Sequence, residues 1–387
     1  MRNEAKLLIG ALAQAVAGKP LQMPEQIDWQ MFRNMSRAHG VDALVCQGLK
    51  DGGVWDQVPE ELQKYYSALY LQAIYLEAQF EHVHKQLQQE LTEANVPHIF
   101  LKGVCLKQDY PVPALRTMCD IDVLVYTDDY DKIAKIAKSL GGEPGHSDGN
   151  HRNYTFAGPV EVEFHPNLLH HSTPVGTQIN PGWQYAKKDC PTSSIELTEE
   201  GFYLNTICHL ANHFVRGGVG VRFVLDVWVS RNLRKSQPDR AFVEKELKRF
   251  GLLDFTCNLE ALAENWFGNG ETSELLEELG EYFITSGSHG VSNRAMLNAV
   301  TLSEGGTKTS ALLEKAFYSR AELEDRFPWC KGKPWLLPAA WCTRAFRAVK
   351  NHGNLIVKWS EGTGRVSQQE VDIQREKLAR FGIKKGK

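Results

Sequence analysis

Residues 116–125 read RTMCDIDVLV, and this stretch predicts a strand whose two faces differ sharply in polarity. Because side chains alternate in direction along a strand, Asp120 and Asp122 share one face, and the apolar residues that alternate with them share the other. Two carboxylates about 5 Å apart repel each other by roughly 3 kcal/mol at an effective dielectric constant of 20. A bound divalent cation would remove this repulsion, so the aspartate pair predicts a metal site at the start of the strand.

A second stretch, VEVEFH at residues 160–165, offers a third carboxylate. Its alternation places Glu161, Glu163 and His165 on one face and apolar residues on the other, as expected for a strand anchored in the core. Carboxylates from two neighbouring strands form an oxygen cluster that suits Mg²⁺, which usually keeps water and phosphate oxygens as further ligands. Such a cluster is typical of phosphoryl or nucleotidyl transfer, in which one ion activates the acceptor oxygen and the other holds the triphosphate.

The chain as a whole predicts an α+β fold, in which helical regions flank a small mixed β-sheet on both sequence sides. Apolar residues recur every three or four positions up to about residue 95 and again from about residue 196, which indicates helices. Short apolar runs bounded by glycine and proline lie between these regions, together with one helical pattern. We therefore expect an N-terminal helical region at 1–95, an α/β core at 96–195, a helical domain at 196–350 and a basic tail at 351–387.

Composition indicates an ordinary globular protein of 387 residues, with 42% hydrophobic and 24% charged side chains. The net charge of −3 gives no basic footprint for duplex nucleic acid. The basic C-terminal end is expected to be a solvated helix end, with contact to an anionic partner as the alternative. Eight cysteines occur singly, which favours reduced thiols in a cytoplasmic protein over disulfides or a zinc site.

The N-terminal residues 1–19 are expected to form the first helix rather than a signal peptide. Their apolar residues follow helical spacing, and Glu4 lies where a signal peptide would be positively charged. No apolar run in the sequence approaches the length that spans a bilayer, so no membrane partner is expected.

Two long motifs taken together carry a resemblance to a known superfamily. They are FLKGVCLKQDYPVPALRTMCDIDVLV at residues 100–125 and VEVEFHPNLL at residues 160–169. In this order they resemble the nucleotidyltransferase superfamily that includes DNA polymerase β. The chain is more closely similar to the branch known as uncharacterised nucleotidyltransferases of bacteria, which carries an L-K-G turn, a Tyr and an Arg before D-I-D, and an acid two residues before a His. The similarity extends into the C-terminal helices and covers most of the chain.

The resemblance implies a nucleotidyltransferase core at 96–195 and assigns roles to the acidic residues within it. Asp120 and Asp122 would bind both metal ions, and Glu163 would be the third carboxylate. Glu163 is preferred because it lies two residues before His165, as in the family's motif. Glu161 lies on the same face and is the alternative.

The resemblance also implies how the nucleotide phosphates are held. Lys102 and Gly103 occupy the place of the superfamily's Gly-Ser turn, whose backbone N–H groups bind phosphate. Val104 follows here, so the usual hydroxyl is missing, and the distance in sequence from Gly103 to the aspartates is longer than usual. Lys102 is expected to compensate as a phosphate cation, with a solvated lysine as the alternative. Arg116 either meets phosphate or pairs with an aspartate.

Three histidines complete the set of candidate site residues. His165 is expected to be a hydrogen-bonded structural residue, with a role as a base or as a partner of the acids as the alternative. His209 and His213 lie four residues apart on one helical face, but the glutamate of the H-E-x-x-H zinc proteases is absent between them. A polar helix face is the simplest interpretation, whereas the resemblance implies that this face closes over the nucleotide with Arg222 and Asp226.

The leading hypothesis is an enzyme that transfers a nucleoside monophosphate from an NTP to an unknown acceptor and releases pyrophosphate. It would use two Mg²⁺ ions, with Mn²⁺ as the alternative, and would act mainly by positioning and charge neutralisation. The acidic balance favours a small molecule or a protein over a long nucleic acid as acceptor. A catalytically silent nucleotide-binding or interaction protein is one alternative. A glycosyltransferase that holds a nucleotide sugar through D-x-D is another, and it predicts a long α/β region before that motif.

Overall fold

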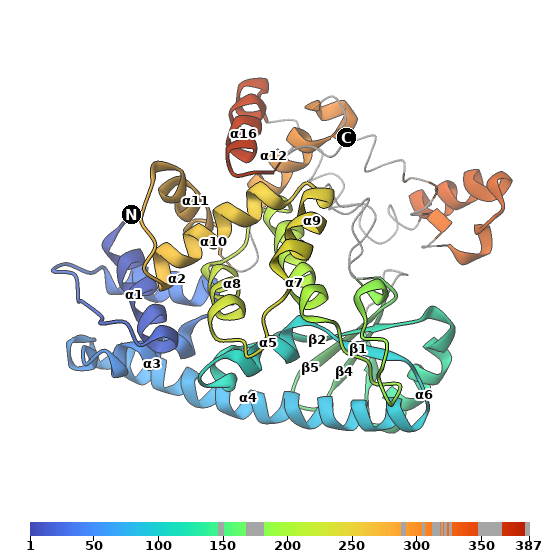
Figure 1. Ribbon diagram of the computed structural model, residues 1–387, viewed down its shortest axis with the longest axis horizontal. Coiled ribbons are helices and arrows are strands. Elements are labelled where there is room, and N and C mark those ends of the chain that lie inside the picture. Colours follow the sequence, from blue (N-terminus) through green and yellow to red (C-terminus); the bar gives the residue numbers. More distant parts are fainter. Residues whose placement is uncertain are drawn as a thin grey trace.

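The computed structural model consists of helices packed on both faces of one five-stranded sheet (Figure 1). The strand order is β1-β2-β5-β4-β3, and only the central pair, β2 and β5, is parallel. The predicted α+β fold class is therefore confirmed. The strands are β1 (His98–Phe100), β2 (Asp120–Val125), β3 (Glu143–Pro144), β4 (Arg152–Phe156) and β5 (Val160–His165). The structure describes residues 1–145, 151–167, 182–287, 292–303, 306–311, 318, 320, 323–324, 327–346 and 366–383.

Helices precede, interrupt and follow the sheet, in the order that the hydrophobic periodicity predicts. Those before it are α1 (Asn3–Ala17), α2 (Trp29–His39), α3 (Asp42–Asp51), the short η1 (Trp55–Gln57) and α4 (Glu60–Glu93). Those within it are α5 (Lys102–Leu106), η2 (Lys107–Asp109), η3 (Pro113–Leu115), η4 (Thr127–Asp129) and α6 (Tyr130–Ser139). Those after it are η5 (Trp183–Tyr185), α7 (Glu199–Val215), α8 (Val221–Asn232), α9 (Arg240–Phe250), α10 (Leu253–Phe267), α11 (Glu274–Ile284), α12 (Ser292–Leu302), η7 (Pro328–Cys330), η8 (Pro334–Leu336) and α16 (Gln368–Arg380).

The alternation predicted for β2 and β5 is present, and it gives each strand one fully buried apolar face. On β2, Ile121, Val123 and Val125 pack in a core together with side chains of α4 and α6. Val162 and Phe164 of β5 join the same core. The acidic residues of both strands therefore lie on the opposite face of the sheet, which is the face toward α7.

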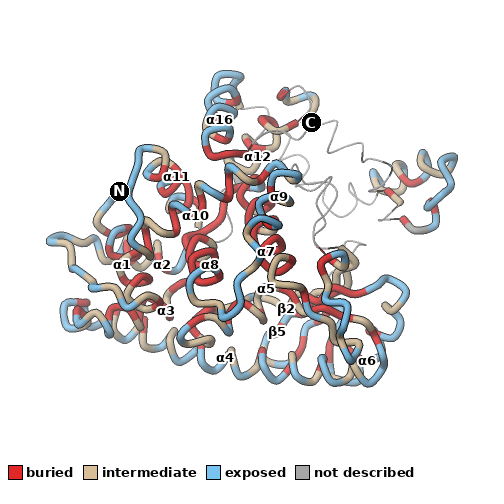
Figure 2. The backbone as a smooth tube through the Cα atoms, viewed as in Figure 1, coloured by how far each residue is buried: buried red, intermediate tan, exposed pale blue. Residues whose placement is uncertain are grey.

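A second, larger core holds the helices together. It contains buried side chains of α1, α3, α7, α8, α10 and α11, so helices from both ends of the sequence share one interior. Figure 2 shows α7 and α8 in this interior, with most of their length buried. Helix α4 takes part in both cores, because its first half packs with α3 and its second half covers the apolar face of the sheet.

The C-terminal helix α16 is a packed element rather than the solvated helix end that the sequence suggested. Ser367 and Glu370 form a capping box at its start, and Val371, Leu378 and Phe381 are buried. The basic residues of its last turn pair with acids of α11, including Arg380 with Glu278 at 3.0 Å. Most of the predicted tail before this helix, and its last four residues, lie outside the described residues.

The predicted N-terminal helix is confirmed as α1, and none of the described helices is long and apolar enough to cross a bilayer. Helix α1 packs closely against α3 at Gly48, where an added Cβ would overlap the carbonyl oxygen of Ala11. This position requires glycine because a backbone atom, not a flexible side chain, fills the space.

Replacing Gly48 with Ala should therefore lower the free energy of unfolding by about 1–3 kcal/mol, the usual cost of overpacking a core. Gln47→Ala is a matched control at the preceding, less buried position of α3, and it should change the free energy of unfolding by about 0.5 kcal/mol or less. Urea unfolding followed by circular dichroism measures both variants. An unchanged midpoint for Gly48→Ala would contradict the close packing of α1 on α3.

Candidate functional site

The parallel pairing of β2 with β5 places acidic residues of the two strands side by side. In the observed register Asp122 lies opposite Glu163, and Asp120 lies opposite Glu161. Glu161 is exposed, whereas Glu163 is partly buried and hydrogen-bonded. Both candidate glutamates therefore lie opposite an aspartate, but only Glu163 belongs to a cluster of bonded side chains among the described residues.

That cluster consists of Asp122, Glu163 and His165. The Nε2 atom of His165 lies 3.0 Å from Oδ1 of Asp122 and 3.3 Å from Oε2 of Glu163. One ligand atom from each of the three residues lies within 4.8 Å of the others, and among the described residues no other group of metal-ligand type is as compact. This trio differs from the predicted one, because His165 takes the place expected for Asp120.

Lys102 provides the second positive group of the site. Its Nζ atom lies 3.0 Å from Oδ2 of Asp122, so each carboxylate oxygen of Asp122 faces a different nitrogen. Lys102 is the first residue of α5, since β1 already ends at Phe100. The Lys-Gly pair therefore begins a short helix, whereas the sequence suggested a turn that ends the strand. An added Cβ at Gly103 would lie 3.2 Å from the sulfur of Met118, so this backbone approaches the segment before β2 closely.

The crowding of charges moves the pKa values of the cluster in opposite directions. Burial, together with the nearby charge of Asp122, raises the pKa of Asp120 to about 6. Burial acts to raise the pKa of Asp122 as well, but the charges of Lys102 and His165 outweigh it and hold that pKa well below its usual range. Burial acts to lower the pKa of His165, yet its bonds to Asp122 and Glu163 raise it to about 9. At neutral pH the imidazole is thus a cation between two carboxylates.

Asn153 is a residue of this site that the sequence analysis did not identify. It lies opposite Glu163 in the β4–β5 register, and its Nδ2 donates a hydrogen bond of 3.1 Å to Oε1 of Glu163. This bond fixes the carboxylate so that Oε2 is directed to His165. His151, on the same face of this segment, has its ring 5.5 Å from that of His165. The alternation of HRNYTF, in which Tyr154 and Phe156 are buried, was the available signal.

Helix α7 carries two further predicted residues. The Nε2 atoms of His209 and His213 lie 3.0 Å apart, and both rings contact that of Phe223 on α8. Burial and the charge of Lys102 keep the pKa of His209 well below its usual value, so its ring is neutral. Asn205 and Asn212 on this helix are buried, with 3% and 7% exposure. The asparagines on the polar side of α7 are therefore buried, whereas His209 and His213 are only partly buried.

Arg116 and Asp226, both predicted to lie at the nucleotide, are paired with each other. Both Nε and Nη2 of Arg116 donate to the carboxylate of Asp226 at 2.8 Å, and Tyr110 donates to the same carboxylate at 2.6 Å. Asp226 is 2% exposed and Arg116 6% exposed. The aspartate that pairs with Arg116 is Asp226 of α8, which lies outside the acidic cluster. Nearby, Arg222 donates to the carbonyl oxygen of Thr117 at 2.9 Å. These bonds tie α8 to the segment that precedes β2.

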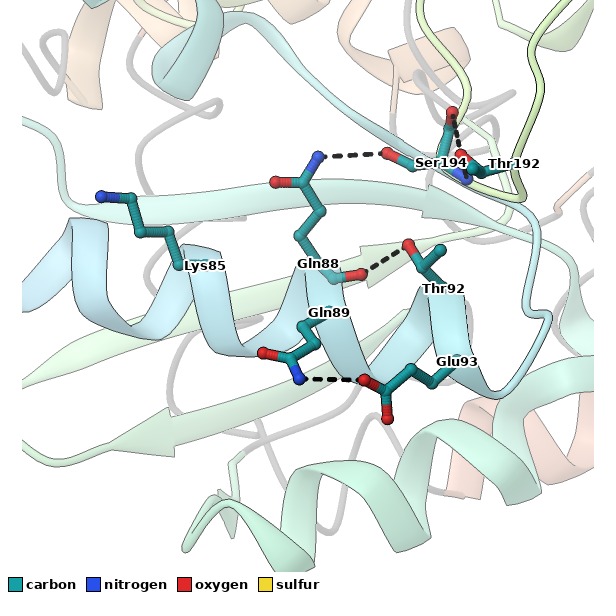
Figure 3. A pocket seen from close by; sticks show the side chains of 7 residues that line it. All are labelled: Lys85, Gln88, Gln89, Thr92, Glu93, Thr192 and Ser194. Carbon is teal, nitrogen blue, oxygen red and sulfur yellow. Dashed lines mark hydrogen bonds between the residues drawn. The ribbon is translucent and has the colours of Figure 1, made fainter.

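A shallow hollow of about 420 Å³ lies at the far edge of the sheet, away from this cluster. It is lined by side chains of the end of α4 and by Thr192 and Ser194 (Figure 3). The segment at Ser194 pairs with His98, which itself pairs with Val125, at the opposite end of β2 from Asp120. The hollow therefore does not belong to the acidic site.

Replacing Asp226 with Ala should lower the free energy of unfolding by about 3–5 kcal/mol, because it leaves the buried guanidinium of Arg116 without its partner. The pKa of Asp226 is lower in the folded state than its ordinary value of 3.8, mainly through Arg116, although burial opposes this. Its stabilising effect is therefore complete at neutral pH and is lost as the pH falls below that value. Chemical unfolding at pH 7 and pH 3 measures this effect. The difference in free energy of unfolding between wild type and variant should be smaller at pH 3 than at pH 7.

Lys187→Ala removes an exposed ion pair with Glu196 and is the matched control, with an expected loss below about 1 kcal/mol. If Asp226→Ala also lowered the free energy of unfolding by less than about 1 kcal/mol, the ion pair with Arg116 would not be what fixes α8 to the segment before β2.

Comparison with known proteins adds the family. Neither the curated proteins nor the solved structures contain a significant match to this chain. A family model described as uncharacterised nucleotidyltransferase matches residues 25–268, which is more than half of the chain and includes the whole sheet with helices α7 to α10. The predicted resemblance to this family is confirmed, and the chain belongs to the uncharacterised nucleotidyltransferase family.

Proposed function

We propose that this protein transfers a nucleoside monophosphate from an NTP to an acceptor, at the acidic face of β2 and β5. The observation that carries the proposal is the register that brings Asp122 opposite Glu163, on the side of the sheet away from its apolar core. Membership of a nucleotidyltransferase family supports the same reaction class. The proposed acceptor is a small molecule or a protein rather than a long nucleic acid, because the net charge of −3 gives no overall attraction to a phosphate backbone.

The residues of the cluster fit a divalent cation. Asp122 and Glu163 supply carboxylate oxygens, which Mg²⁺ and Mn²⁺ prefer, and Asp120 supplies a further carboxylate on the same face. The proposed holders of two such ions are Asp120, Asp122 and Glu163. When bound, these ions would neutralise the triphosphate and lower the pKa of the acceptor hydroxyl.

The basic residues around the acids have separate proposed roles. Lys102, now paired with Asp122, reaches the site from the start of α5 and would bind a phosphate oxygen of the NTP. His165 shares its proton-bearing Nε2 with Asp122 and Glu163 and orients both carboxylates. Asn153 fixes Glu163 from the other side. His209 and His213 lie together on α7, His209 as a neutral ring, and both would contact the nucleotide.

The two alternative functions differ in how well they agree with the fold. A glycosyltransferase should have a long α/β nucleotide-binding region before its D-x-D, but residues 1–93 contain helices α1 to α4. A catalytically silent member of the family remains a real alternative because Val104 follows Gly103, where a hydroxyl residue is usual. Calorimetry with a non-hydrolysable NTP and Mg²⁺, followed by a pyrophosphate-release assay, separates it from the enzyme. Nucleotide binding without release, with every acceptor tried, would favour the silent protein.

With NTPs labelled at the α-phosphate and cell extract as the source of acceptor, the wild-type protein should attach label to a component of the extract. Asp122→Asn should reduce this transfer by at least about 10³-fold, because it removes a carboxylate charge at the centre of the site. The fold should persist, which circular dichroism checks. Transfer at the wild-type rate by Asp122→Asn would refute the assignment of this face as the active site.

Glu163→Gln and Glu161→Gln form a matched pair on one strand that decides the third carboxylate. We expect Glu163→Gln to weaken Mn²⁺ binding at least tenfold, measured by electron paramagnetic resonance of free Mn²⁺, because Glu163 belongs to the compact cluster. Glu161→Gln should bind Mn²⁺ as the wild type does, since Glu161 is exposed outside that cluster. The reverse ranking would assign the role to Glu161.

A further inference from the structure

The outer side of helix α4 carries an apolar stripe that no other described element covers. Helix α4 has 34 residues and runs along one whole edge of the molecule (Figure 1). Its inner side is buried in the two cores, whereas Leu71 and Tyr75 on its outer side are 68% and 62% exposed. Ile74, beside them, is 40% exposed. Large apolar side chains gathered on one exposed helix face usually mark a surface for a partner.

The spacing of this stripe is that of a helix-pairing surface. Exposed residues on the outer side recur at intervals that alternate between four and three, over about 30 Å of helix. They are Lys64, Ala68, Leu71, Tyr75, Ala78, His82 and Lys85. Apolar residues occupy the middle four positions and ionisable residues occupy the ends. A repeat of 3.5 residues keeps one seam facing a second helix along its whole length.

We propose that a second copy of this chain covers the stripe, with the two α4 helices antiparallel around a two-fold axis near residue 73. In this register Leu71 packs against Tyr75 of the partner subunit, and Ala68 packs against Ala78 of the partner subunit. The small alanines on either side of the centre let the helices approach closely. The same patch then serves both subunits, as a closed two-fold dimer requires.

The charges along α4 select the second copy and the antiparallel direction. Glu61 is brought beside Lys85 of the partner subunit, and Lys64 beside Glu81 of the partner subunit. Within one chain Lys64 lies 3.8 Å from Glu61 and Lys85 lies 2.7 Å from Glu81. The side chains of Glu61, Lys85, Lys64 and Glu81 are 90%, 71%, 64% and 51% exposed, so each can also meet an opposite charge of the partner subunit. A parallel dimer would instead place Lys64 beside Lys64 of the partner subunit and Lys85 beside Lys85 of the partner subunit, and these like charges would repel.

The dimer leaves both acidic sites accessible. Helix α4 covers the apolar face of the sheet and shares one core with Val123 and Phe164, whereas Asp122 and Glu163 lie on the other face. Association through the outer side of α4 therefore joins two chains back to back. This inference does not depend on the proposed reaction, because it uses none of the residues assigned to it.

Light scattering coupled to size exclusion tests the assembly directly. The chain mass is 43.6 kDa, and the wild type at micromolar concentration should elute with twice this mass. The double variant Leu71→Glu/Tyr75→Glu should elute as a monomer with an unchanged circular dichroism spectrum. Ile373→Glu is the matched control on α16, where the side chain is 57% exposed, and it should remain a dimer. A wild-type monomer, or a dimer that survives the double variant, would overturn the proposal.

Charge reversal tests the direction of the helices. Lys85→Glu should weaken the dimer about tenfold in sedimentation equilibrium, because it faces Glu61 of the partner subunit in both symmetric pairs. Adding Glu61→Lys to the same chain should restore most of the affinity. If the second reversal weakens the dimer further, the antiparallel register is wrong. A stripe covered by a different protein would appear as a wild-type monomer and would equally refute the second copy as its occupant.

Discussion

The parallel pairing of β2 with β5 is the constraint on which the site depends. Each strand must turn its apolar residues toward α4 and α6, so the register leaves Asp122 directly opposite Glu163 on the other face. Two carboxylates on neighbouring parallel strands cannot move apart without breaking the sheet. Their repulsion has to be neutralised locally, and the protein does this with a protonated imidazole, a lysine and an amide donor.

This neutralisation explains why the cluster differs from a simple trio of acids. His165 follows Glu163 by two residues on β5, so it lies on the same face and reaches both carboxylates. Asp120, the first residue of β2, has no such hydrogen-bonded partner among the residues that the structure describes, and burial and the charge of Asp122 raise its pKa to about 6. The site thus holds one strongly ionised acid beside one that titrates near neutrality. Such a pair is suited to bind cations whose arrival completes the charge balance.

Buried hydrogen bonds and the packing of α4 fix the acidic face relative to the helices. Arg116 and Tyr110 converge on the buried carboxylate of Asp226 and fix the segment before β2 to α8. Helix α4 spans both cores and connects the helical region to the back of the sheet. The outer side of the same helix is the surface that we assign to a second copy. One long helix therefore supports the site from behind and carries the proposed dimer contact, and the two functions do not compete for the same residues.

The sequence by itself determined the strands β2 and β5, their inner and outer faces, the major helices and the family. The strands, their faces and the helices follow from local rules, since the alternation of polarity and the three- to four-residue spacing depend only on neighbours along the chain. The family follows from the resemblance of two longer motifs. The spacing of Glu163 to His165 already favoured Glu163 over Glu161, and the register places it opposite Asp122. Only the tertiary structure decided that Asn153 bonds to Glu163 and that Arg116 is paired with Asp226. Each of these contacts depends on strand register or on elements more than a hundred residues apart in the sequence. A periodic pattern fixes the face of a strand on which a residue lies, but it does not name the residue of a neighbouring element that it meets.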